Sequence, residues 1–187
     1  MGLTGVPRGE GLGKGGLEGG GGRGDPRRAR HVAEQAATQF ATLPPAFTLL
    51  PGLASVAEVS LALWEASGNQ PSPERTALAE SARQACAALR YTRRLPIGQP
   101  SAWLWQGLYD WLAGKPSKAH TAWQKGLKTA AKLSMPYEQG LAHSAIGRHL
   151  GADEPARQMH LTRACDIFTR LQAAYELGRA QQVLATR

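Results

Sequence analysis

Apolar residues from residue 29 onward recur at three- and four-residue spacings, which is the period of an amphipathic helix. The clearest stripe lies in residues 117–134, where small, aliphatic and aromatic side chains share one face. Its members are Ala119, Ala122, Trp123, Leu127, Ala130 and Leu133. The same pattern predicts a series of helices separated by breaks that contain Gly or Pro. Their expected ranges are 28–41, 52–65, 74–91, 101–113, 117–134, 137–150, 156–171 and 173–185.

The amino-acid composition also favours helices over strands. The 187 residues include 31 Ala but only 5 Val and 3 Ile. Ala has the highest intrinsic helix propensity, whereas strands favour β-branched and aromatic residues. The composition therefore predicts an all-α fold.

The N-terminal residues 1–27 form a separate compositional region. Of the 22 Gly in the chain, 12 lie in residues 1–24, and the first Ala is Ala29. We expect a disordered tail, because so Gly-rich a segment has too few apolar residues to form a core. Residues 11–16 match the glycine pattern of dinucleotide-binding loops, but no predicted strand precedes them and no predicted helix follows. We therefore expect no nucleotide or other cofactor.

The remaining residues, 28–187, repeat with a period near 40. Four pairs coincide at an offset of 40: Pro96 and Pro136, Gln99 and Gln139, Ala102 and Ala142, Gly107 and Gly147. Four more coincide at an offset of 38: Leu133 and Leu171, Tyr137 and Tyr175, Gly140 and Gly178, Ala142 and Ala180. Helix pairs repeated in this way bury their apolar faces by stacking on their neighbours. We expect an α-solenoid of antiparallel pairs with units 28–51, 52–95, 96–135 and 136–172, followed by a terminal helix in 173–187.

Local signals predict how two of these helices begin and how one of them packs. Ser72 followed by Pro73 is typical of an N-cap and a first-turn proline, and we expect Asp153 and Pro155 to do the same for residues 156–171. Gly107 lies in the middle of a predicted helix, where Gly costs about 1 kcal/mol relative to Ala. We therefore expect a neighbouring helix to approach closely at Gly107.

The unit 96–135 resembles the tetratricopeptide (TPR) repeat, which is itself a pair of helices. The resemblance lies in an aromatic and a small residue of the first helix, a turn glycine, and a small and an aromatic residue of the second. These are Trp103, Gly107, Gly114, Ala119 and Trp123. The unit departs from the TPR pattern at Gln106, Asp110 and Gly126, where Leu, an aromatic residue and Ala are usual.

More specifically, residues 59–66, 103–114 and 135–150 are similar to the C-terminal TPR-like region of large bacterial signalling proteins. In those proteins, an AAA-type ATPase module follows a class III adenylate or guanylate cyclase or a Ser/Thr protein kinase. The resemblance covers residues 28–187 and implies a role in signal transduction, with such a module as partner. It also leaves open that the chain is a C-terminal fragment of such an enzyme, regulating cAMP synthesis or phosphorylation. The chain contains no cyclase, kinase or ATPase motif, so the resemblance implies no catalytic residue.

Such solenoids present a concave surface built from the first helix of each pair. We expect this surface to bind a protein or peptide without catalysis. The candidate binding residues are Trp105, Gln106, Tyr109, Asp110, His143, Ser144 and Arg148. We expect no metal site, because His143 and His149 are six residues apart on one helix and point to different faces.

Four lysines form a candidate basic face on the predicted helix 117–134: Lys118, Lys125, Lys128 and Lys132. Such a face attracts an acidic partner or RNA in a salt-dependent way. No exposed aromatic is interleaved with these lysines, because Trp123 belongs to the apolar stripe. We therefore expect a solvated face and no dedicated nucleic-acid site.

The overall charge and the remaining signals predict a cytoplasmic protein. The net charge is +8, of which residues 1–30 contribute +3, so the helical part is only modestly basic. Cys86 and Cys165 lie within apolar helical patterns, which predicts buried thiols and no disulfide framework. The chain has neither an apolar run of about 18 residues nor the pattern of a signal peptide. The oligomeric state stays open.

Overall fold

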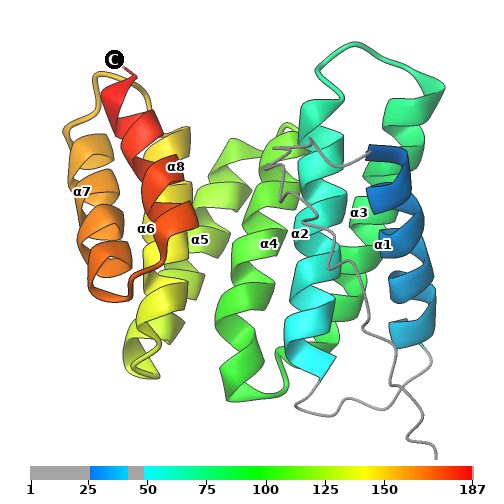
Figure 1. Cartoon of the computed structure of the whole chain (residues 1–187), viewed down its shortest axis with the longest axis horizontal. Coiled ribbons are helices and arrows are strands. Elements are labelled where there is room, and N and C mark those ends of the chain that lie inside the picture. Colours follow the sequence, from blue (N-terminus) through cyan, green and yellow to red (C-terminus); the bar gives the residue numbers. More distant parts are fainter. Residues whose placement is uncertain (1–25, 42–48, 187) are drawn as a thin grey trace, which may run out of the picture.

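The computed structural model describes residues 26–41 and 49–186, and these residues are helical with no strand among them (Figure 1). The tail predicted for residues 1–27 lies outside the described part except for its last two residues, which begin the first helix. The helices are α1 (Pro26–Ala41), α2 (Leu50–Ala66), α3 (Pro73–Thr92), the short 3-10 helix η2 (Pro96–Gly98), α4 (Gln99–Leu112), α5 (Pro116–Lys132), α6 (Pro136–His149), α7 (Pro155–Arg170) and α8 (Ala174–Ala185).

The all-α prediction is therefore confirmed for the described residues, but most predicted helices begin too late. The reason is that seven of the described α-helices carry a proline in their first turn, as α4 does at Pro100 and α5 at Pro116. Proline fits this position because the first helical N–H groups need no intrahelical partner. Pro73 and Pro155 are first-turn prolines as predicted, whereas Pro51, Pro100 and Pro116 fall in the predicted breaks.

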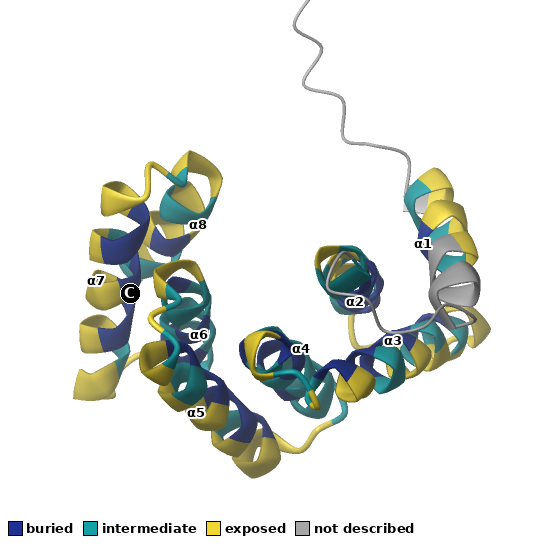
Figure 2. Ribbon diagram, turned by 90° about the horizontal axis from the view of Figure 1, so that it is seen from below, coloured by how far each residue is buried: buried dark blue, intermediate teal, exposed yellow. Residues whose placement is uncertain are grey.

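The helices form a curved row in which each one packs on the next. α2 packs on α3, α4 on α5, α6 on α7, and the chain ends with α8 against α7. Figure 2 shows α2, α4, α6 and α8 along the inner side of the curve and α3, α5 and α7 along the outer side. The alternation places the first helix of each predicted pair on the inner side.

Buried side chains form a series of clusters along this row. One pair of clusters joins α2, α3 and α4, a third joins α4, α5 and α6, and a fourth joins α7 and α8. Trp105 of α4 packs against three of the four clusters. Cys86 is buried, and burial raises the pKa of its thiol to about 12, whereas Cys165 is only half-buried.

The close approach predicted at Gly107 is confirmed, and its partner is the indole of Trp123. A β-carbon at Gly107 would collide with that ring. Trp123 is fully buried, and its Nε1–H donates a hydrogen bond to the backbone oxygen of Leu104 at 3.1 Å. Trp123 therefore holds α5 closely against α4 at this point.

Only one of the two predicted helix caps is present. Ser72 Oγ accepts a hydrogen bond from the backbone N–H of Arg75 at 3.0 Å, as predicted. Asp153 does not cap α7, because Glu154 occupies the N-cap position and makes no capping hydrogen bond. Its Oε1 instead accepts from the backbone N–H of Gly151 at 2.9 Å and closes the preceding turn. Pro155 does lie in the first turn of α7.

Candidate functional site

The inner side of the curved row contains a groove with a volume of about 580 Å³. The four inner helices α2, α4, α6 and α8 contribute most of its lining (Figure 2). Its floor is apolar and includes Leu104, Trp105, Leu108, Leu141 and Ala145. Its charged lining residues are Glu58 and Glu65 of α2, Arg148 of α6, and Glu176 and Arg179 of α8.

An ion pair crosses the groove between residues 83 positions apart. Arg148 Nη2 of α6 lies 2.5 Å from Glu65 Oε1 of α2. Each side chain is about one-third exposed (33% and 31%), so solvent screens the pair only in part. The contact links α6 to α2 across the groove. It also pairs two of the five charged groups that line the groove.

The α8 side of the groove has its own polar contacts. The hydroxyl of Tyr137 in α6 donates a hydrogen bond to Glu176 Oε1 at 2.6 Å. Burial, reinforced by this carboxylate, raises the pKa of Tyr137 above its ordinary value. The Arg179 guanidinium lies 5.7 Å from the ring centre of Tyr175, and 70% of Tyr175 is exposed. The rim therefore presents an aromatic and a cationic side chain to solvent.

Glu58 of α2 also lines the groove. It makes no hydrogen bond or ion pair with the residues that the structure describes. Loss of water inside the groove raises the pKa of its carboxyl, the Arg179 guanidinium opposes the rise, and Glu176 adds to it. Glu58 is a solvent-exposed carboxylate at the edge of an apolar floor.

A histidine and two tryptophans close the floor at α6. The His149 ring stacks on Trp123, with ring centres 4.7 Å apart, and lies edge-on to Trp111 at 4.6 Å. His149 Nδ1 lies 2.7 Å from the backbone oxygen of Ala145. A carbonyl oxygen only accepts hydrogen bonds, so Nδ1 carries the proton. Burial lowers the pKa of His149 to about 4, which leaves Nε2 of the neutral ring as an acceptor.

Of the seven candidate binding residues, three line this groove: Trp105, Ser144 and Arg148. Gln106 and Asp110 line a smaller pocket of about 330 Å³ between α4 and α5, where Gln106 donates to Asp110 at 3.3 Å. The other two side chains pack against neighbouring helices.

Those two are Tyr109, which lies against Trp64 with ring centres 5.6 Å apart, and His143, whose ring contacts that of His160 in α7. The structure therefore does not bring the seven residues into one surface. The physical reason is helical rotation, because neighbouring residues differ by about 100° in direction. Gln106 and Asp110 are turned away from Trp105 and toward α5.

Two parts of the groove were missed from the sequence: the α2 carboxylates and the α8 rim. The repeat itself held a signal for the rim, because Tyr175 corresponds to Tyr137 at the offset of 38. If α6 belongs to the inner side, α8 must belong to it as well. Nothing in the local sequence around Glu58 or Glu65 distinguishes them from other surface carboxylates.

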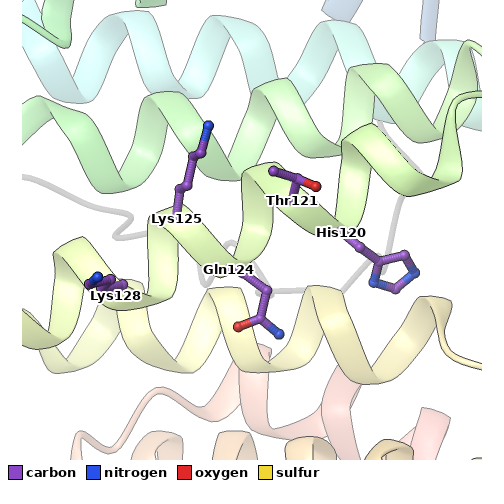
Figure 3. Close-up of a pocket in the computed structure, with 5 residues that line it drawn as sticks. All are labelled: His120, Thr121, Gln124, Lys125 and Lys128. Atoms are coloured by element: carbon purple, nitrogen blue, oxygen red, sulfur yellow. The ribbon is translucent and has the colours of Figure 1, made fainter.

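The four candidate lysines are exposed on α5. Lys125 and Lys128 border a shallow pocket of about 420 Å³ together with His120, Thr121 and Gln124 (Figure 3). Figure 3 shows that Lys125 points toward α4 and Gln124 toward α6. Trp123 is buried as expected, but an aromatic from another helix does lie here. Lys125 Nζ is 5.0 Å from the ring centre of Trp103 in α4, and the Arg93 guanidinium is 3.8 Å from it.

Within the described residues, no group of three or more His, Cys, Asp or Glu side chains is placed to hold a metal ion. None of the described helices is both long and apolar enough to cross a bilayer. Comparisons with protein-family models, curated proteins and solved structures gave no significant match. A functional assignment therefore depends on the groove.

Proposed function

We propose that this chain is a non-catalytic, TPR-like α-solenoid in which the concave groove binds a segment of another protein. The groove itself carries the proposal. It joins an apolar floor to a charged rim, and both are assembled from helices distant in the sequence. Protein interfaces combine an apolar centre with a polar rim in this way. The alternation of inner and outer helices supports the assignment to helical-repeat scaffolds.

The exposed side chains of the rim favour a protein over a small molecule as the ligand. Tyr and Arg are enriched at protein interfaces relative to the rest of the surface. Tyr175 and Arg179 stack together at the rim, and Tyr175 is largely exposed. An extended or helical segment that crosses the inner side can contact this rim and the floor at Trp105 together.

The sequence resemblance extends the proposal to a cellular role. We propose that the chain acts in the cytoplasm as a regulatory segment of a signalling assembly. Its partner would be an ATPase, cyclase or kinase module, either on a separate polypeptide or on a larger chain of which this sequence is part. This extension rests on the resemblance of residues 28–187 to the TPR-like region of such proteins.

A peptide selection against the full chain tests the proposal. Peptides enriched from a random phage-displayed library should bind with micromolar or better affinity. Ala62 is exposed and lines the groove, so Ala62→Trp fills the groove without disturbing buried contacts. We expect this variant to weaken binding at least ten-fold, which corresponds to about 1.4 kcal/mol.

The matched control is Ala131→Trp, which adds the same side chain at an exposed position of α5 outside the groove. It should leave affinity unchanged, and circular dichroism should show equal helical content in both variants. Failure to enrich any peptide, or equal binding by both variants, would contradict the proposal.

A further inference from the structure

The groove and the outer surface of the protein differ in the sign of their charge. The outer helix α5 presents four exposed lysines and contains no acidic residue, and the whole chain has a net charge of +8. The groove lining has three carboxylates and two guanidinium groups. The groove lining therefore carries one net negative charge on a basic protein.

Contacts within the groove leave one carboxylate available to a ligand. Glu65 pairs with Arg148 at 2.5 Å, and Glu176 accepts the Tyr137 hydroxyl at 2.6 Å. Glu58 makes no hydrogen bond or ion pair with the described residues, although Arg179 lies near enough to act on it electrostatically. Glu58 is exposed to solvent and lines the groove, so a cationic group of a ligand can reach its carboxylate. A charge-assisted hydrogen bond to that carboxylate is stronger than a neutral one.

The surroundings of Glu58 also indicate which kind of ligand side chain would carry the cation. Val59 and Ala62 of the same helix line the groove, and the floor below them is formed by α4. Trp105 is half-buried and joins three of the buried clusters, so it is held rigidly. A rigid aromatic floor beside a carboxylate suits a side chain with an apolar stem and a cationic head, such as Lys or Arg.

We propose that the groove binds a protein segment carrying a Lys or Arg that pairs with Glu58, flanked by apolar side chains that pack on Leu104, Trp105 and Leu108. This inference rests on the proposed function, since it names the chemistry of the partner at the same groove. An acidic segment fits less well, because Glu65 already occupies Arg148 and the other guanidinium, that of Arg179, already lies near Glu58. This cationic partner also differs in charge from any polyanion that the lysines of α5 attract.

The test uses the full chain and the peptides selected against it. We expect the selected peptides to combine apolar residues with at least one Lys or Arg. Changing that residue to Gln should weaken binding about ten-fold, and Glu58→Gln should weaken the unchanged peptide by about the same factor. In the Glu58→Gln protein, the peptide change should have little further effect, because both substitutions remove the same contact.

Glu74→Gln is the matched control, because it removes the same charge from an exposed position of α3 outside the groove. It should leave affinity unchanged. Peptides that are blocked by Ala62→Trp but unaffected by Glu58→Gln would overturn this inference and leave the proposed function standing. Selected peptides that are acidic would do the same. Peptides unaffected by Ala62→Trp would instead overturn the proposed function.

Discussion

At the scale of single residues, glycines allow neighbouring helices to pack closely because they lack a β-carbon. The indole of Trp123 lies over Gly107, the ring of Phe168 lies over Gly140, and Leu161 lies over Gly147. Each large side chain fills the space that a glycine leaves on the neighbouring helix, which allows closer packing than Ala would. Gly178 occupies the repeat position of Gly140 on α8, but among the described residues no neighbouring helix comes within 4 Å of its β-carbon position.

Gly107→Ala and Gly178→Ala should therefore change stability in opposite directions. Ala at 107 collides with Trp123, so we expect a loss of about 1–3 kcal/mol in the free energy of unfolding despite the better helix propensity of Ala. Ala at 178 meets no atom, so we expect a gain of about 0.5–1 kcal/mol. Urea unfolding followed by circular dichroism measures both. A stabilising Gly107→Ala would show that Trp123 does not pack as described.

Buried histidines make stability depend on pH. His143 Nδ1 and His160 Nδ1 lie 2.8 Å apart between α6 and α7, so at least one ring is neutral. Burial lowers the pKa of His143 to about 4, and His160 and Arg163 act in the same direction; burial likewise lowers the pKa of His149 to about 4. The pKa of His160 is also lowered, by burial and by His120.

Because these pKa values lie below the ordinary value of 6.5, the unfolded chain binds more protons than the folded chain between pH 6.5 and about 4. The free energy of unfolding should therefore be highest above pH 6.5 and fall as the pH is lowered to about 4. The double variant His143→Gln, His160→Gln should show a shallower fall. His31→Gln, at an exposed position of α1, should leave the profile unchanged. A profile that is flat in the wild type would contradict the assignment.

At the scale of helices, the residues at helix starts and those after helix ends differ in how easily they are recognised in the sequence. First-turn prolines begin α3, α5, α6 and α7. The ends of α5 and α7 are followed by Ser134 and Gln172 with positive φ values of 53° and 56°. Gly or Asn usually occupies such a position, so neither residue was a recognisable stop signal. The predicted ends of all the helices nevertheless lie within two residues of the observed ends, as the predicted starts do.

The Ser72 cap is the element-level feature most open to a direct test. Ser72→Ala removes the acceptor for the Arg75 N–H, and we expect a loss of about 1 kcal/mol in the free energy of unfolding. Ser117→Ala is the control, because Ser117 also lies at an exposed position in a first turn, that of α5, but is not its N-cap. It should change stability by less than about 0.5 kcal/mol. Equal losses would mean that the cap contributes nothing.

At the scale of the whole molecule, the sequence predicts the helices well and the groove poorly. Stripes such as that around Trp123 depend only on residues three and four apart, so they identify each helix from its own sequence. The groove depends on how far the row curves, which brings Glu65 within 2.5 Å of Arg148 across α4. No local pattern encodes that curvature. The sequence predicted Trp105, Ser144 and Arg148 as binding residues, and these do line the groove. It did not predict the groove residues of α2 and α8.

The series of clusters along the row predicts that a core substitution at one end of the molecule destabilises that end most. In a stacked array, each helix pair is stabilised mainly by its neighbours. Phe168→Ala removes a fully buried ring shared by α7 and α8 and should cost about 3–5 kcal/mol locally. Hydrogen exchange should then show loss of protection in α6, α7 and α8 while α2 and α3 stay protected. Leu89→Ala, in the cluster that joins α2, α3 and α4, should give the reverse. Uniform loss of protection in either variant would mean that the chain unfolds as one cooperative unit. That outcome would contradict the stacked-repeat assignment.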